Sequence, residues 1–129
     1  MAPEESSRRR RSRVIGASAL VGMGVLHVLV PKPFLAIIPR WLPAPRALNL
    51  AAGAAELTSG ALLLSGDPAR RRLGGAVAAA TMIGVYPANV QMAVDVGRPE
   101  TAFEWGVWFR LPLQLPMIAW ALDHARGPR

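Results

Sequence analysis

The sequence predicts an all-α membrane protein: a four-transmembrane-helix bundle with a Pro-rich interfacial segment between the first and second spans. Four apolar stretches approach the ~20 residues that a helix needs to cross the hydrocarbon of a bilayer. Hydrophobic residues make up 52% of the chain, and the charged residues gather at its ends and in the connections. The predicted spans are Val14–Val30, Ala47–Ser65, Leu73–Val94 and Val107–Ala121.

Length and composition limit the domain organisation and the class of partner. At 129 residues there is room for one bundle. We expect a basic cytoplasmic N-terminal tail over residues 1–13, a transmembrane domain over residues 14–124 and a cytoplasmic C-terminal tail over residues 125–129. The chain has no Cys, which excludes disulfides and thiolate metal sites. A net charge of +7 in a soluble protein would indicate nucleic acid, but the Arg residues lie at span ends. We therefore expect a lipid bilayer as partner and no nucleic acid.

The distribution of basic residues predicts the orientation of the bundle. Ten of them precede the first span, lie between the second and third, or follow the fourth, and four crossings place these segments on one side. The opposite side has four basic residues. Cytoplasmic loops carry the excess of Arg and Lys, so both termini are expected on the cytoplasmic side of a cell membrane.

The first connection, residues 31–45, contains five of the twelve prolines. Proline prevents a long helix there, because it lacks the backbone donor and clashes with the preceding turn. Apolar residues nevertheless recur at helix-like spacing, and Trp41 is suited to the headgroup level of a membrane. We expect a broken segment at the outer interface, which either covers the bundle as a lid or only lies on the lipid.

Polar and small residues recur at helical spacing along each span, which predicts faces turned toward other helices rather than toward lipid. Pro87 should also kink the third span and free the carbonyl group of Ile83. The predicted faces are Ser18 and Gly22 on the first span, Asn49, Gly53, Glu56 and Gly60 on the second, Tyr86, Asn89 and Ala93 on the third, and Arg110, Gln114, Met117, Ala121 and His124 on the fourth.

Five polar residues of the outer and middle parts of the spans are the candidate ligand-binding residues: His27, Glu56, Asn89, Arg110 and Gln114. Burying an ionisable side chain in a membrane costs about 2.5–3.5 kcal/mol on insertion scales, so these residues need a reason to be there. Two readings stay open: a network that holds the helices together, and an outward-facing pocket for a small ligand or a proton path. We predict that Glu56 and Arg110 interact, directly or through Gln114 and a water. A lone His near the outer end does not indicate a metal site, and no catalytic residue is indicated.

Several segments resemble the bacterial DoxX-like family. They are residues 27–34 (HVLVPKPF), 38–43 (IPRWLP), 53–57 (GAAEL), 86–93 (YPANVQMA) and 110–114 (RLPLQ). The resemblance implies a four-helix bacterial membrane protein with both termini inside. Some members of that family are similar to a small subunit of thiosulfate:quinone oxidoreductase, or belong to membrane complexes for thiol and oxidant defence. The resemblance implies no catalytic residues.

Three classes of function follow from these observations. The first is a non-catalytic subunit or anchor of a membrane redox or stress-response complex, with a membrane or peripheral redox protein as partner and no independent enzymatic activity. The second is a subunit that binds a quinone or another small ligand, in which Arg110, Asn89 and Gln114 bond a carbonyl or anion and Glu56 moves a proton. The third is a small transporter, which is ranked last because the inner halves of the spans are too apolar for a polar path.

Overall fold

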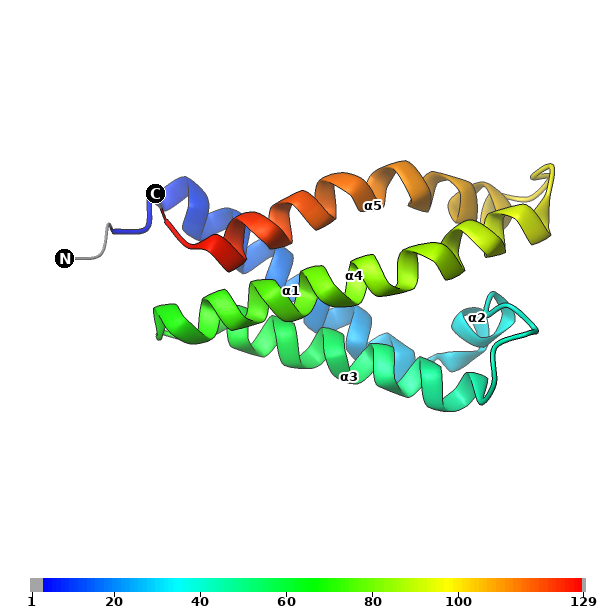
Figure 1. Ribbon diagram of the computed structural model, residues 1–129, viewed down its shortest axis with the longest axis horizontal. Coiled ribbons are helices and arrows are strands. Elements are labelled where there is room, and N and C mark those ends of the chain that lie inside the picture. Colours follow the sequence, from blue (N-terminus) through cyan, green and yellow to red (C-terminus); the bar gives the residue numbers. More distant parts are fainter. Residues whose placement is uncertain (1–3, 129) are drawn as a thin grey trace.

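The computed structural model describes residues 4–128, which form five helices and their connections, without a strand. Residues 1–3 and 129 of the two predicted tails lie outside this range. The helices are α1 (Ser7–Leu29), α2 (Pro31–Ala36), α3 (Pro45–Leu64), α4 (Pro68–Val96) and α5 (Ala102–Arg126). The long helices α1, α3, α4 and α5 form the body of the bundle, and the short α2 lies at the end opposite the chain termini (Figure 1).

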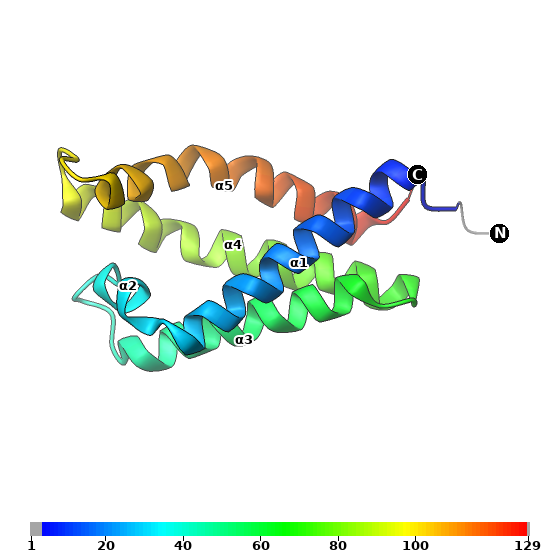
Figure 2. The same cartoon turned by 180° about the vertical axis from the view of Figure 1, so that it is seen from behind.

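The main contacts between the long helices join neighbours in the chain. α1 packs against α3, α3 against α4, and α4 against α5. Seen from behind, α1 crosses α3 and reaches the end of α5 beside the chain termini (Figure 2). Their buried cores consist mainly of small and flexible apolar side chains. One core is formed by Ala17, Leu20, Leu63, Ala78, Ala79, Met82 and Ala121, and a second, near α2, by Met92, Ala93 and Val107.

Three of the helices, α1, α3 and α4, are long and apolar enough to cross a membrane. Large apolar side chains on their outer surfaces are exposed, and so are several on α5, where Phe109 is 66% exposed. A surface of this kind needs an apolar surrounding, because contiguous exposed apolar patches are rare on soluble monomers. The structure is therefore compatible with a membrane protein.

Two helices begin earlier than the predicted spans. α1 begins at Ser7, seven residues before the first predicted span, so the Arg-rich segment is helical rather than an extended tail. Ser6 starts this helix by accepting a hydrogen bond from the backbone N–H of Arg9. Helix α5 also begins earlier than predicted, at Ala102, behind a capping box made by Thr101 and Glu104.

Buried Arg13 connects this helical start to the rest of the bundle. Its guanidinium donates to the backbone carbonyl of Leu63 and forms two 2.8 Å bonds with the Glu5 carboxylate. Arg71 lies 3.3 Å from the same carboxylate and donates to the carbonyl of Ser65. The hydrogen bonds from Arg13 hold the pKa of Glu5 below its ordinary value. The two arginines thereby join the start of α1 to the end of α3 and the start of α4.

The predicted inward faces are confirmed on three helices and wrong on the first. The predicted residues of α3 and α4 are buried or half-buried, and on α5 only Met117 of its set is exposed. On α1, however, Ser18 and Gly22 are exposed, and Gly22 has only open space beside it. The face of α1 that meets α3 carries Ala17 and Gly24 instead.

Glycine is required where α1 and α3 approach most closely. A Cβ atom placed on Gly24 would lie 2.7 Å from the carbonyl oxygen of Gly53, closer than real atoms come. One placed on Gly53 would lie 2.8 Å from the Cβ of His27. The two backbones therefore pack directly on each other, as small residues allow between membrane helices.

Gly24 and Gly22 form a matched pair for testing this contact. Gly24→Ala should lower the melting temperature in detergent, because overpacking costs about 1–3 kcal/mol and exceeds the ~0.5–1 kcal/mol that alanine gains over glycine in a helix. Gly22→Ala should leave the melting temperature unchanged or raise it, since its new methyl group meets nothing. Equal effects of the two substitutions would contradict the close approach.

Candidate functional site

The polar face of α3 forms a notch that receives His27 of α1. Asn49, Gly53 and Glu56 follow one another along this face, and the imidazole lies over Gly53 between the two polar side chains. The glycine makes the space, because any larger residue would meet the Cβ of His27. Asn49 and Glu56 lie on either side of Gly53 on α3. The asparagine amide therefore faces one ring nitrogen of His27, and the glutamate carboxylate faces the other.

Asn49 fixes the orientation of His27 through two hydrogen bonds. Its Nδ2 donates to the backbone carbonyl of His27 over 2.8 Å, so its Oδ1 faces the ring. Oδ1 lies 2.6 Å from His27 Nδ1, and because an amide oxygen only accepts, Nδ1 must carry the proton. Both residues are buried, and the asparagine ties the last turn of α1 to the first turns of α3.

The other ring nitrogen faces the carboxylate of Glu56. Nε2 of His27 and Oε2 of Glu56 are 3.3 Å apart, yet the geometry is too poor for a hydrogen bond, and Oε2 is buried without any partner in residues 4–128. With Nδ1 already protonated, a favourable contact needs one further proton, on Nε2 or on the carboxyl group. His27 and Glu56 thus form a pair suited to hold one exchangeable proton.

Helix α2 contacts His27 of this pair at the end of the bundle opposite the chain termini. The ring of Phe34 lies on the imidazole of His27, with centroids 3.9 Å apart and the planes tilted by 30°. The prolines of the first connection permit only this six-residue helix, which is compatible with the predicted broken segment. Ile37, which directly follows α2, packs against the small core near the α4–α5 connection.

Arg110 does not make the predicted direct contact with Glu56. The half-buried guanidinium comes from α5, and within the described part of the chain it forms no ion pair with the carboxylate. It remains the cation whose charge acts on Glu56 through space. Both ends of the Gln114 amide bond to α4, and the predicted link through Gln114 and a water stays a prediction.

Asn89 and Gln114 form a second polar cluster, between α4 and α5. Asn89 Nδ2 donates to Gln114 Oε1 over 2.7 Å, and Gln114 Nε2 donates over 2.7 Å to the carbonyl of Met82. This carbonyl adjoins that of Ile83, which Pro87 is expected to free. Both amide side chains are buried, and these bonds hold the two helices together where Pro87 lies inside α4.

The five predicted site residues thus divide between two helix pairs. His27 and Glu56 belong to the α1–α3 contact, Asn89 and Gln114 to the α4–α5 contact, and Arg110 lies on α5, with only its charge reaching Glu56. Sequence reasoning missed the roles of Asn49 and Phe34. For Asn49 the missing information was the pairing of α1 with α3: Gly24 meets Gly53 and Ala17 meets Gly60, so the helices are antiparallel and His27 lies opposite Asn49. Among residues 4–128 no group of three metal-binding side chains occurs.

The comparisons with known proteins give a family without a described role. The family described as "Domain of unknown function (DUF8561)" matches residues 17–125. The chain belongs to this family. No curated protein and no solved structure matches it.

A comparison of double-mutant cycles should identify the true partner of Glu56. We expect the effects of His27→Phe and Glu56→Gln on thermal stability in detergent to deviate from additivity by about 0.5–3 kcal/mol, because the side chains are in contact. The cycle of Glu56→Gln with Arg110→Gln should show a smaller coupling of the same kind, since these groups interact only through space. Removing one member of a buried pair leaves the other uncompensated, so the double changes should recover part of the loss.

The matched control for these cycles is Gln114→Leu combined with Glu56→Gln. Within residues 4–128 the Gln114 side chain bonds only to α4, so its effect should add to that of Glu56 within about 0.3–0.5 kcal/mol. If the effects of His27→Phe and Glu56→Gln on stability simply add, the two side chains do not interact.

Proposed function

We propose that the protein is a multi-pass membrane subunit that binds a small ligand at the His27–Glu56 pair, with a quinone headgroup as the ligand class that fits best. The observation that carries this proposal is the buried Oε2 of Glu56, which lacks a hydrogen-bond partner within the described chain and faces a histidine nitrogen. The pair offers one exchangeable proton, and a quinone carbonyl takes up a proton when it is reduced. Phe34 supplies an aromatic surface beside the pair.

Arg110 completes the chemistry of this proposed site. Its guanidinium lies on α5, across from the α1–α3 contact, and forms no ion pair among the described residues. A planar donor of this kind can bond a carbonyl or an anionic oxygen that enters between it and Glu56. Intramembrane ionisable residues are functional candidates by default, because burying them is costly.

Four membrane crossings with cytoplasmic termini are part of the proposal. α5 has 25 residues, which is long enough to cross a bilayer, and it supplies the fourth crossing beside α1, α3 and α4. The Arg-rich segments of α1 and α4 and the last turn of α5 lie at one end of the bundle (Figure 1). The positive-inside rule assigns this end to the cytoplasm, and α2 with the exposed Trp41 then lies at the outer interface.

A second candidate function is a structural anchor without a ligand. The hydrogen bonds of Asn89 and Gln114 favour it, because these two buried side chains join α4 to α5. The resemblance to the DoxX-like family fits this reading as well, and it would place the protein in a bacterial membrane beside a redox partner. We give this reading second place because it leaves Glu56 unexplained.

Single cysteines introduced at residues 69 and 102 should establish the topology, since the chain has none of its own. An impermeant thiol reagent added to intact cells should label the cysteine at 102, beside the α4–α5 connection, and spare the one at 69. A cysteine at residue 3, outside the described residues, should also be spared. Labelling at 69 from outside would overturn the four-span arrangement with cytoplasmic termini.

Ligand binding can be measured with a short-chain ubiquinone analogue added to the protein in nanodiscs. At a concentration of 100 times Kd, binding should stabilise the wild type by about 2.7 kcal/mol, which appears as a higher melting temperature. Glu56→Gln and Arg110→Gln should each reduce this shift. Glu100→Gln and Arg98→Gln, which change exposed residues of the α4–α5 connection, serve as controls and should keep it.

A wild type that gains no stability from the analogue would contradict the proposed ligand class. A shift retained in both Glu56→Gln and Arg110→Gln would place quinone binding elsewhere on the chain. Absence of any shift, combined with a protein that co-purifies in mild detergent, would favour the anchor.

A further inference from the structure

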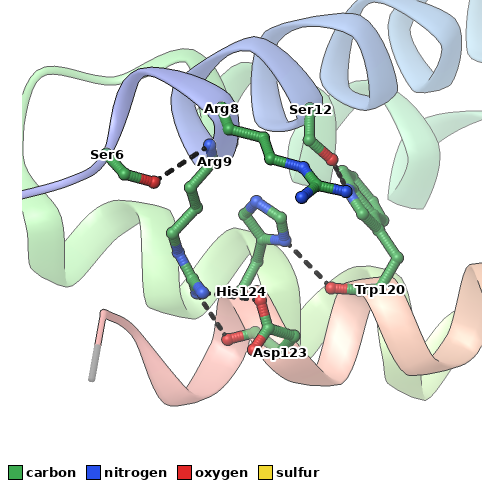
Figure 3. A pocket seen from close by; sticks show the side chains of 7 residues that line it. All are labelled: Ser6, Arg8, Arg9, Ser12, Trp120, Asp123 and His124. Carbon is green, nitrogen blue, oxygen red and sulfur yellow. Dashed lines mark hydrogen bonds and ion pairs between the residues drawn. The ribbon is translucent and has the colours of Figure 1, made fainter.

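The end of the bundle opposite α2 holds a hollow of about 260 Å³ between the start of α1 and the end of α5 (Figure 3). Its lining includes Arg8, Arg9 and Ser12 from α1, and Trp120 and His124 from α5. A water molecule takes up only about 30 Å³ in the liquid, so the hollow has room for a larger group. The His27–Glu56 site lies at the other end of the molecule and plays no part here.

His124 is the unusual member of this lining. It is only 5% exposed, and its Nδ1 donates to the carbonyl of Trp120 over 2.9 Å. Its Nε2 is buried and has no hydrogen-bond partner within residues 4–128. Figure 3 shows the free edge of the ring directed toward α1, between the side chains of Arg8 and Arg9. A buried polar atom without a partner is costly, so this nitrogen indicates a missing ligand group.

The neighbouring side chains leave further donors available. Arg9 is already paired with Asp123, through a 2.6 Å ion pair and a 2.7 Å bond to its backbone carbonyl. Arg8 takes part in no ion pair within the described range. Ser12 accepts a hydrogen bond from Trp120 Nε1 over 3.1 Å, which leaves its own O–H free to donate. A guanidinium and a hydroxyl thus supply donors to one space, and the His124 ring adds a third when Nε2 carries a second proton.

We propose that this hollow binds a phosphate group, and that the headgroup of an anionic lipid supplies it. Guanidinium and other charge-assisted donors match the oxygens of a phosphate in both charge and geometry. The apolar part of α1 begins at Val14, two residues after Ser12, so the hollow lies at the height where a lipid headgroup meets its acyl chains. Trp120 in the lining suits the same interfacial level. Basic residues beside a membrane helix commonly recognise anionic lipids.

The test uses the full chain in mild detergent, with lipids added and bound molecules counted by native mass spectrometry. Phosphatidylglycerol should be retained in a saturable manner, and phosphatidylcholine should be retained far less. Arg8→Gln and His124→Phe should each weaken phosphatidylglycerol binding about tenfold, as expected for the loss of one charge-assisted hydrogen bond. Arg10→Gln removes an equal charge from an exposed position outside the lining and should bind like the wild type.

Each other outcome is informative as well. Inorganic phosphate that displaces phosphatidylglycerol supports a shared phosphate site, and phosphate that binds where the lipid does not overturns the lipid as the source. Equal weakening by Arg8→Gln and Arg10→Gln overturns the proposal, because it indicates attraction by diffuse charge rather than a built site. If His124→Phe does not fold, the comparison of Arg8→Gln with Arg10→Gln decides.

Discussion

The direct packing of α1 on α3 is the constraint on which the candidate site depends. Gly24 and Gly53 let the two backbones meet, and this contact sets the distance at which His27 reaches Asn49 and Glu56. In an apolar solvent, tight packing and interhelical hydrogen bonds replace the hydrophobic effect as the forces between helices. A bulkier residue at either glycine would therefore alter the geometry of the proton-holding pair as well as the stability of the bundle.

The sequence predicts helices and faces well where spacing alone decides them. Residues four and three apart on α3 placed Asn49, Gly53 and Glu56 on one side, and the structure turns that side inward. The face of α1 could not be chosen this way, because Ser18 with Gly22 is as plausible a small-residue pair as Ala17 with Gly24. Only the contact with α3 distinguishes them.

The composition of the site was harder to predict than the helices. Depth along a span gives the height of a side chain but not its direction around the bundle or the order of the helices. Five polar residues in the outer and middle parts of the spans therefore suggested one pocket, whereas the helix order divides four of them between two contacts. The direction of Arg110 depends on α5 as a whole, and no local pattern encodes it. The unpartnered nitrogen of His124 was equally hidden, since its burial results from packing against α1 and α4.

The order of helix contacts also has a mechanical consequence. α1 meets α5 at the basic end, where Arg9 binds Asp123 and Trp120 binds Ser12, while the opposite ends of these helices belong to different pairs. A helix of 25 residues is about 38 Å long. α4 holds α5 along this length, through the bond of Gln114 to Met82 and the packing of Val107 against Met92 and Ala93. The position of α5 in the bundle is therefore set by α4, and α1 adds a second point of attachment at the basic end.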